Sequence, residues 1–329
     1  QGLFCRSYKE ESSERKMEIP DRQGNKHAQK RIILEFIMNH RSGFVNILGN
    51  PNVGKSTIMN ALVGEKLSII TSKAQTTRHR IMGIVSGEDF QIVYSDTPGI
   101  VRPKYQLHQS MMNFVKTALT DADIIIYVTD VTEKKEDIND YTEKIKSSGI
   151  PVIVVINKVD LSNQTELEII VQSWKDRFPG SPVIPVSALR NFNLDILLNA
   201  IISKLPEGEP YFPKDQLTDK YERFFASEII REKIMVNYQK EVPYSAEVEI
   251  ESYKEENDLL RIRAVIHVAR DTQKGIIIGH KGAKLKKTGT QARHDMEEFF
   301  GRKVFLELYV KVTKDWRDKP QDLKRFGYR

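Results

Sequence analysis

A complete phosphate-binding loop, Gly-Asn-Pro-Asn-Val-Gly-Lys-Ser at residues 49–56, constrains the fold of this chain more than any other feature. An apolar, strand-like run, Phe44–Leu48, precedes the loop, and a helix-like run, Thr57–Val63, follows it. The glycines let the backbone curl, so that successive N–H groups and the N-terminus of the next helix point at phosphates. The loop predicts a nucleoside triphosphate site in which Lys55 contacts phosphate and Ser56 binds the bridging Mg²⁺.

A second motif, Asn157-Lys158-Val159-Asp160, follows the buried-strand pattern Ile150–Ile156 and indicates that the base is guanine. A carboxylate at Asp160 can accept hydrogen bonds from both the ring N–H and the exocyclic amine of guanine. Adenine cannot satisfy that arrangement, so ATP would leave the carboxylate unpaired. Ser187-Ala188-Leu189, after the strand-like run Val183–Val186, is expected to complete the base pocket with backbone N–H groups.

A third motif, Asp96-Thr97-Pro98-Gly99, lies between these two, directly after the strand-like run Gln91–Ser95. Asp96 is expected to reach the metal through water, and Gly99 to donate its N–H to the γ-phosphate. Thr76 and Thr77 are both candidates to close over the metal, and the sequence does not choose between them. The expected nucleotide-binding residues are Gly49, Asn50, Pro51, Asn52, Val53, Gly54, Lys55, Ser56, Thr57, Asp96, Thr97, Pro98, Gly99, Ile100, Asn157, Lys158, Val159, Asp160, Ser187, Ala188 and Leu189.

Ile100 occupies the position where many regulatory GTPases have a glutamine that orients the attacking water. An apolar side chain cannot polarise water, so intrinsic hydrolysis is expected to be slow. The backbone, a monovalent cation, a partner or a rearranged loop must then hold the water. Arg78 and His79 are less favoured alternatives, because charged loop residues are usually solvated. The catalytic residue is therefore left unassigned.

The fold class expected is α/β, with a doubly wound P-loop GTPase domain followed by a smaller α+β domain. Strand-like runs alternate with helical patterns at Leu107–Thr120 and Ile138–Ser147, and 329 residues with 40% apolar content can supply two cores. No apolar run is long enough to span a membrane. A single cysteine, Cys5, excludes an intramolecular disulfide and fits a reducing compartment, so the cytoplasm is the expected location.

The expected domain boundaries follow changes in composition. Residues 1–40 are polar, charged and without a secretory pattern, and are read as a disordered or spurious extension, with Met38 as a candidate start. The GTPase domain is assigned to residues 41–206. The proline-rich stretch at 207–219 is expected to be a semi-rigid linker, and residues 220–329 form the second domain.

The second domain carries a Gly-x-x-Gly loop, Gly279-His280-Lys281-Gly282, within a helix–strand–strand–loop–helix–strand order. The glycines permit a tight turn at which a nucleic-acid backbone can approach the main chain, and single-stranded RNA is the common ligand of such loops. Residues 270–329 contain 16 Lys or Arg and 8 Asp or Glu, a net +8 against +6 for the whole chain. The expected RNA-binding residues are Gly279, His280, Lys281, Gly282, Lys284, Lys286, Lys287 and Arg293.

These motifs resemble the translation-factor-related GTPases, and Pro51-Asn52 is similar to the subgroup that contains the Era family. The second domain resembles a type II KH domain. Gly289-Thr290-Gln291-Ala292-Arg293, Phe299-Phe300-Gly301 and Lys314-Asp315-Trp316-Arg317 resemble the Era family of bacterial GTPases over Gly43–Arg329. The resemblance implies binding to the 3′ end of 16S rRNA, a role in maturing the 30S ribosomal subunit, peripheral association with the inner membrane, and K⁺ coordination by Asn52.

Two other functions are open. A non-enzymatic RNA chaperone would use the nucleotide only to stabilise its fold, with Ile100 keeping hydrolysis slow. A membrane-surface switch would place Lys311–Arg329 against anionic lipid, although these basic residues alternate with apolar and acidic ones. A monomer is expected, because neither domain shows an unclaimed apolar helix face.

Overall fold

The computed structural model describes residues 40–133 and 141–328, and these form two compact units. The first unit contains the described residues up to Ser68 together with Arg80–Thr97 and Val115–Asp219. The second contains Ile69–His79, Pro98–Phe114 and the described part of 220–329. The expectation for the N-terminal extension falls on residues 1–39, which lie outside the described residues.

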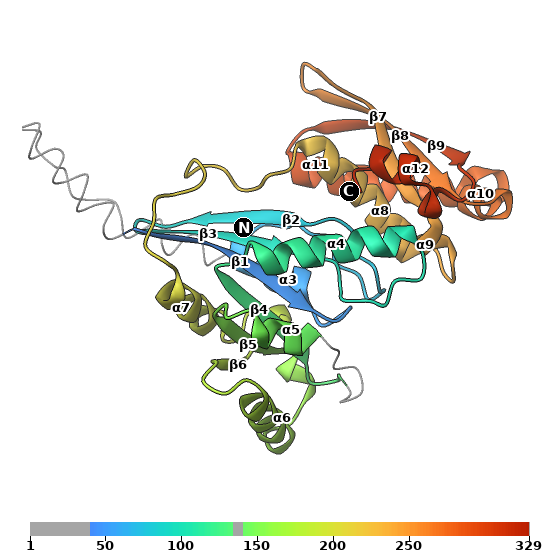
Figure 1. Ribbon diagram of the computed structural model, residues 1–329. Coiled ribbons are helices and arrows are strands. Elements are labelled where there is room, and N and C mark those ends of the chain that lie inside the picture. Colours follow the sequence, from blue (N-terminus) through green and yellow to red (C-terminus); the bar gives the residue numbers. More distant parts are fainter. Residues whose placement is uncertain (1–39, 134–140, 329) are drawn as a thin grey trace, which may run out of the picture. The chain divides into compact units, whose positions relative to one another are not determined.

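A six-stranded sheet forms the centre of the first unit, with the strand order β2-β3-β1-β4-β5-β6 (Figure 1). All neighbouring pairs are parallel except β2 and β3, which are antiparallel. The strands are β1 (Arg41–Gly49), β2 (Ile81–Ser86), β3 (Phe90–Asp96), β4 (Ile124–Asp130), β5 (Val152–Asn157) and β6 (Val183–Pro185).

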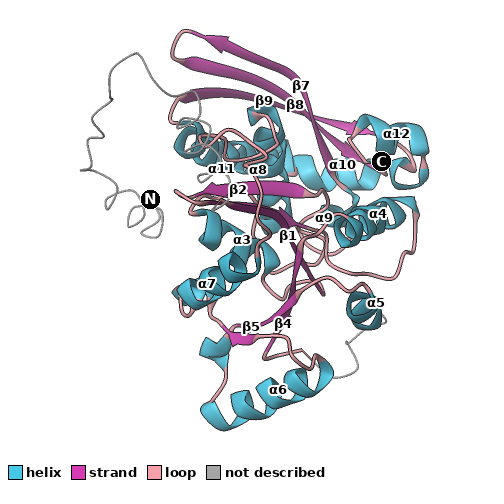
Figure 2. Cartoon of the chain, turned by 60° about the vertical axis from the view of Figure 1, so that its left-hand side comes forward, coloured by secondary structure: helices cyan, strands magenta, loops and turns pink. Residues whose placement is uncertain are grey.

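Helices alternate with the parallel strands, as the sequence predicted for a doubly wound fold. Helices α3 and α7 lie on one side of the central strands and α5 on the other (Figure 2). The helices are α3 (Lys55–Val63), α4 (Gln106–Thr120), α5 (Tyr141–Ser147), α6 (Gln164–Arg177) and α7 (Leu194–Lys204). Part of the predicted helix at Ile138–Ser147 is confirmed as α5; its first residues lie outside the described part of the chain.

Every residue of β3, β4 and β5 is buried, which explains the apolar, β-branched runs of β4 and β5. The sequence did not predict β2. Because β2 is the last strand at one end of the strand order, buried and partly exposed residues are mixed along it and give a weaker pattern. Among the described residues, no helix is long and apolar enough to cross a lipid bilayer.

The proline-rich stretch 207–219 packs along the strands of the first unit. The N–H of Ile84 donates to the carbonyl of Leu217 at 2.8 Å, and Ser42 Oγ donates to the carbonyl of Glu209 at 2.5 Å. The Gln91 amide bonds both the carbonyl and the N–H of Phe212. These contacts fix the stretch to the sheet of the first unit up to Asp219.

In the second unit, a three-stranded sheet with the order β7-β8-β9 packs against α8 and α11. Strands β7 and β8 are antiparallel, whereas β8 and β9 are parallel. The elements are α8 (Glu222–Asn237), α9 (Val242–Ser245), β7 (Glu247–Glu256), β8 (Leu259–Val268), α10 (Asp271–Ile278), α11 (Ala283–Phe300), β9 (Lys303–Val312) and α12 (Pro320–Arg325). Helix α8 supplies an apolar face to this core, since Ala226, Ile230 and Ile234 are fully buried.

Candidate functional sites

The phosphate-binding loop turns sharply between β1 and α3. Gly49 has φ 151°, and a Cβ there would lie 2.2 Å from the carbonyl oxygen of Val128. Gly54 has φ 96°, and a Cβ there would lie 2.1 Å from Nδ2 of Asn157. Side chains at these two positions are therefore excluded by space as well as by backbone conformation.

Lys55 is only 6% exposed, and its ammonium donates to the carbonyls of Gly49 and Asn50 at 3.1 and 2.8 Å. Burial lowers the pKa of Lys55 to about 8, although the negative charges of Asp96 and Glu133 oppose the shift. The lysine therefore curls over the loop with its charge directed at the loop interior. A phosphate bound in the loop would give the Lys55 ammonium a negatively charged partner in place of these two neutral carbonyls.

Ser56 and Asp96 meet where β3 ends beside α3, with Ser56 Oγ donating to Oδ2 of Asp96 at 2.6 Å. Thr97 is fully buried and donates to the carbonyl of Ile47 at 2.8 Å, which fixes the chain directly after Asp96. A hydroxyl and a carboxylate are hard oxygen donors that suit Mg²⁺. The residues present therefore fit the metal that the sequence predicted.

Asn157 connects the phosphate-binding loop to the base pocket. Its amide donates to the carbonyl of Val53 at 2.9 Å and accepts from the N–H of Ala188 at 3.1 Å. Asp160 accepts from Ser187 Oγ at 2.5 Å. The structure thus brings together three loops that lie far apart in the sequence, with the Asp160 carboxylate exposed at their edge.

The remaining predicted nucleotide residues of the first unit are distributed around these loops. Asn50, Val53 and Ala188 are buried. Five residues are partly exposed, namely Pro51, Ser56, Thr57, Lys158 and Val159. Two are exposed, Asn52 and Leu189. Asn52 is an exposed residue of the loop and has φ 66°.

Two acidic residues near these loops were missed by the sequence analysis. Asp130, at the end of β4, binds the Lys158 ammonium at 2.6 Å. Glu133 accepts hydrogen bonds from Asn50 and Thr129. The only available signal was their position at the carboxyl end of a buried strand, where parallel α/β sheets place ligand loops.

The remaining predicted residues of the nucleotide site belong to the second unit; they are Thr76, Thr77, Pro98, Gly99 and Ile100. The Thr76 hydroxyl bonds the carbonyl of Lys73 and Oγ1 of Thr71, each at 2.6 Å. Thr77, Pro98 and Ile100 are buried. The buried side chain of Ile100 offers no polar group to a water molecule.

Arg78 and His79 pack against other residues of the second unit, to which they belong, instead of standing free in a solvated loop. The guanidinium of Arg78 is fully buried and binds Glu247 at 2.9 Å and the carbonyl of Ala246 at 2.8 Å. His79 stacks on Tyr328 with a ring separation of 4.4 Å, and burial lowers its pKa below the ordinary value. These contacts account for both residues structurally.

The Gly-x-x-Gly loop joins α10 to α11. Gly279 has φ 70°, and a Cβ there would lie 2.8 Å from Cβ of Lys284. Gly282, with φ 77°, directly precedes α11, whose first N–H groups have no intrahelical partners. His280, Lys281, Lys284, Lys286 and Lys287 are all exposed around this helix N-terminus. The geometry presents backbone donors and cations to a phosphate backbone.

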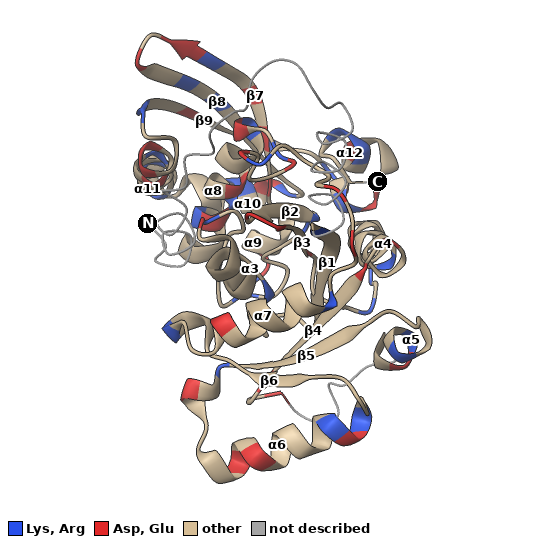
Figure 3. Ribbon diagram, turned by 90° about the vertical axis from the view of Figure 1, so that its left-hand side faces the viewer, with Lys and Arg blue, Asp and Glu red and all other residues tan. Residues whose placement is uncertain are grey.

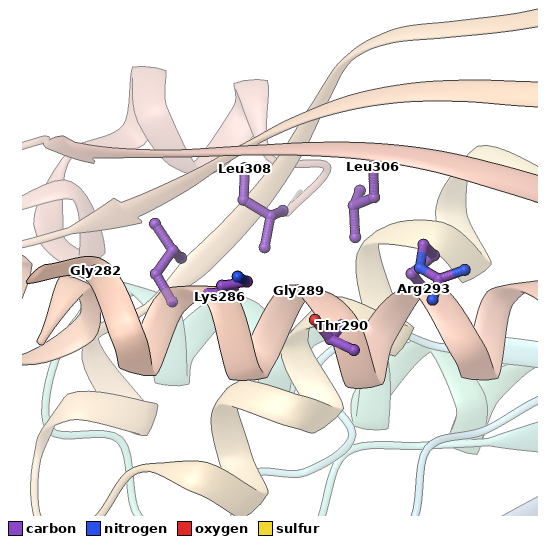
Figure 4. Close-up of a pocket in the computed structure, with 8 residues that line it drawn as sticks. Gly282, Lys286, Gly289, Thr290, Arg293, Leu306 and Leu308 are labelled. Carbon is purple, nitrogen blue, oxygen red and sulfur yellow. The ribbon is translucent and has the colours of Figure 1, made fainter.

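Beside the loop, α11 and β9 enclose a groove of about 380 Å³. Leu306 and Leu308 extend from β9 toward α11, while Lys286, Thr290 and Arg293 lie along the helix (Figure 4). Arg293 also pairs with Glu297 at 2.9 Å. An apolar floor with a basic and polar wall suits unstacked bases and their phosphates. The sequence analysis named Lys286 and Arg293 as RNA-binding candidates but did not name Leu306, Leu308 or Thr290.

The outer strands do not share this basic character. Acidic and basic residues are interspersed along β7, β8 and β9 (Figure 3), as in the pairs Arg261–Glu256 at 2.5 Å and Arg263–Glu307 at 3.3 Å. Four exposed lysines, Lys281, Lys284, Lys286 and Lys287, cluster at the loop and the start of α11. Fold and sites together define a P-loop GTPase joined to a KH domain.

Comparisons with known proteins agree with this class. The family model of the 50S ribosome-binding GTPases matches residues 44–158, and that of the KH domain matches residues 241–317. GTPase Era of Syntrophus aciditrophicus (strain SB) is 44% identical over 292 residues, covering 88% of this chain and 95% of that protein. GTPase Era of Staphylococcus haemolyticus (strain JCSC1435) is 43% identical, covering 88% and 97%. The chain belongs to the Era family of GTPases.

Solved structures agree at the level of the fold. A variant of Aquifex aeolicus Era bound to GDP and aluminium fluoride gives a TM-score of 0.84 at 43% identity, covering 88% of this chain and 99% of that one. Era in complex with MgGDPNP and nucleotides 1506–1542 of 16S ribosomal RNA gives a TM-score of 0.85 at the same identity and coverage. The predicted order of a GTPase domain followed by a KH domain is confirmed.

Proposed function

We propose that this protein is a GTP-hydrolysing switch that binds 16S rRNA near its 3′ end through the KH domain and assists maturation of the 30S subunit. The combination of a guanine-nucleotide site with a basic Gly-x-x-Gly groove in one chain supports the proposal most directly. The Era relative with MgGDPNP carries an RNA from this region. We assign the GTPase domain to residues 41–206, the linker to 207–219 and the KH domain to 220–329, after an N-terminal extension at 1–40.

In the nucleotide site, we assign phosphate binding to the backbone of the loop at 49–56 and to Lys55, and base choice to Asp160. The Ser187–Ala188 backbone supports the base pocket through Asn157. Ser56 and Asp96 hold Mg²⁺, with Thr76 or Thr77 as a further ligand. When bound, Mg²⁺ neutralises charge on the outer phosphates. Thr97, Pro98 and Gly99 carry the γ-phosphate contact through the main chain.

The attacking water needs a partner other than the side chain of Ile100. We propose that K⁺ bound at Asn52 contributes, because Asn52 is exposed on the outer turn of the loop with φ 66°. Turnover compared in potassium and sodium tests this point. Equal rates in the two salts would exclude a role for the cation.

In the RNA site, we assign backbone contacts to Gly279, Gly282 and the N-terminus of α11, and phosphate contacts to the lysines that follow. We further propose that GTP orders the segment around Thr76–Thr77 and thereby raises RNA affinity, and that hydrolysis releases the RNA. Equal RNA affinity in the GTP-analogue and GDP forms, at matched salt, would exclude this gating.

The decisive experiment measures GTP turnover with and without a short RNA copied from the 3′ end of 16S rRNA, in potassium buffer. Stimulation by the RNA is expected, and a scrambled RNA of equal length is the control. The burial of Ile100 favours one alternative, a nucleotide-stabilised RNA chaperone. Tight RNA binding without any stimulation would favour that alternative.

We also propose that the protein is a cytoplasmic monomer that associates peripherally with the inner membrane. Flotation with anionic vesicles at low and high salt tests the membrane contact, and sedimentation tests the oligomeric state. Failure to float at low salt would remove the membrane role without affecting the assignment of the two sites.

A further inference from the structure

The C-terminal end of α8 holds the segment that contains Thr76 and Thr77. The Lys73 ammonium donates to the carbonyls of Met235 and Tyr238, which lie in the last turn of α8 and at its C-cap. Carbonyls at a helix C-terminus lack intrahelical partners and favour a cation. All of these residues belong to the second unit. The position of Lys73 is therefore tied to this helix end.

The same helix end also contacts both helices that flank the Gly-x-x-Gly loop. Tyr238 is 3% exposed, and its hydroxyl donates to the carbonyl of Ile277 at 2.8 Å and lies 3.1 Å from Oγ1 of Thr288. Ile277 is in the last turn of α10, and Thr288 is fully buried in α11. The amide of Asn237 donates to Gln291 of α11 at 2.7 Å. Tyr238 thus contacts the Lys73 segment through its carbonyl and the loop helices through its hydroxyl.

A buried charge holds the other part of the segment. The guanidinium of Arg231 is fully buried, donates to the carbonyl of Thr76 and pairs with Glu228 through contacts of 2.8 and 2.5 Å. Its Nη1 atom has no hydrogen-bond partner among the described residues. A buried ion pair contributes little net stability, so its presence here favours a role in fixing one arrangement of the segment.

We propose that Tyr238 and Lys73 are positioning residues that couple occupation of the Gly-x-x-Gly loop to the placement of the Thr76–Thr77 segment. The inference rests on the proposed function and assigns its regulation to particular residues. RNA at the loop moves or stiffens the ends of α10 and α11, and the Tyr238 hydroxyl transmits this to the helix end that holds Lys73. By linkage, nucleotide state changes RNA affinity by the same factor as RNA changes nucleotide affinity.

The test replaces Tyr238 by Phe, which removes the hydroxyl and keeps the ring. RNA affinity is measured with a GTP analogue and with GDP, and the ratio of the two affinities reports the coupling. For the unchanged protein, a ratio of roughly 5 to 150 is expected. Tyr238→Phe should reduce the ratio roughly 2- to 12-fold, the effect of one neutral hydrogen bond. GTP turnover without RNA should stay within about twofold, because the hydroxyl of Tyr238 bonds Ile277 and Thr288, neither of which is assigned to the nucleotide site.

Tyr253 supplies a matched control, because its hydroxyl donates to Glu222 in the first turn of the same helix. Tyr253→Phe removes a tyrosine hydroxyl that binds the opposite end of α8, and it should leave the ratio of the two RNA affinities unchanged. Lys73→Met removes the ammonium that binds the carbonyls of Met235 and Tyr238, and it should also reduce the ratio of the two RNA affinities. The double variant Tyr238→Phe/Lys73→Met should lose no more than the larger single loss, because both act through one contact.

Thermal unfolding confirms that each variant is folded. Undiminished coupling in both folded single variants would overturn the assignment of Tyr238 and Lys73 while leaving the proposed function intact. An unchanged protein that binds RNA equally with both nucleotides would overturn the coupling itself. A chain that hydrolyses GTP but does not bind the RNA would overturn the proposed function, and with it this inference.

Discussion

The proposed nucleotide site and the proposed RNA groove both suit phosphate groups, but their side chains are arranged in opposite ways. In the nucleotide site, Lys55 and Asn157 are buried and already bonded to the loop backbone. In the groove, Lys281, Lys284 and Lys286 are exposed and stand around two glycines. The first site is preorganised and selects one ligand by shape, whereas the second gathers charge and leaves its ligand room to adapt.

The largest expected effect tests the selectivity of the nucleotide site. Asp160→Ala removes two hydrogen bonds from guanine to a carboxylate, each contributing about 1.5–3 kcal/mol, so GTP affinity should fall roughly 100-fold or more. Calorimetric titration measures it. Asp176→Ala, which removes an exposed carboxylate from α6, should have no effect. A loss of less than about tenfold would mean that Asp160 does not contact the base.

The next effect tests the electrostatic character of the groove. Lys281→Ala/Lys284→Ala should lower the slope of log affinity against log salt by about 1.4, which corresponds to about 25-fold weaker RNA binding at 0.1 M salt. Lys254→Ala/Lys319→Ala removes two exposed lysines elsewhere in the second unit and is the control. A parallel shift with an unchanged slope would show that these lysines act through folding.

The pH dependence of nucleotide binding sharpens the contrast between a buried and an exposed lysine. Burial lowers the pKa of Lys55 to about 8, and bound phosphates should raise it again. Below pH 8 the ammonium is charged with or without ligand. Above pH 8 the free protein loses a proton that the complex keeps, so affinity should fall as pH rises, by up to about tenfold per unit.

Lys55→Arg is the control for this prediction, because an arginine stays charged throughout. Its nucleotide affinity should be weaker but should depend less on pH between 7.5 and 9. Equal pH profiles for the two proteins would show that the dependence arises in the nucleotide and not in Lys55. Fluorescence titration of a labelled GDP provides the measurement.

The smallest effect tests the width of the groove. A Cβ at Gly289 would lie 3.1 Å from Cδ1 of Leu308, so Gly289→Ala should narrow the groove and weaken RNA binding by roughly threefold, since the leucine end can shift in part. Gly275→Ala in α10 gains the same helix propensity but meets nothing within 4 Å. Thermal unfolding should show that neither variant is less stable than the unchanged protein. If both variants bind RNA equally well, the RNA does not occupy this groove.

The two sites also differ in how far the sequence predicts them. The phosphate-binding loop and Asn157–Asp160 are contiguous motifs whose geometry is local, so the sequence could name their residues directly as candidates. Only part of the groove is formed by residues that are close together in the sequence. Its glycines and lysines form a motif, but Leu306 and Leu308 come from a strand that pairs with β8, and leucines in a strand look like any core pattern.

The segment Ile69–His79 shows the limit most clearly. Arg78 and His79 were expected to be solvated loop residues, yet Arg78 is fully buried against residues of α9 and β7, and Lys73 binds the end of α8. These partners lie more than 160 positions away in the sequence. A single sequence contains no local signal for such pairs, because burial of a charge depends on what the fold brings to it.

The sequence alone determined the class of protein, the order of its domains and the loops that face phosphate, because each depends on backbone conformation encoded over a few residues. The tertiary structure decided which side chains support those loops. Asp130 reaches Lys158, Tyr238 reaches Ile277 and Thr288, and Arg231 reaches the Thr76 carbonyl only when strands and helices pack. Local geometry therefore specified the candidate ligand-binding loops, whereas packing specified the contacts that position them.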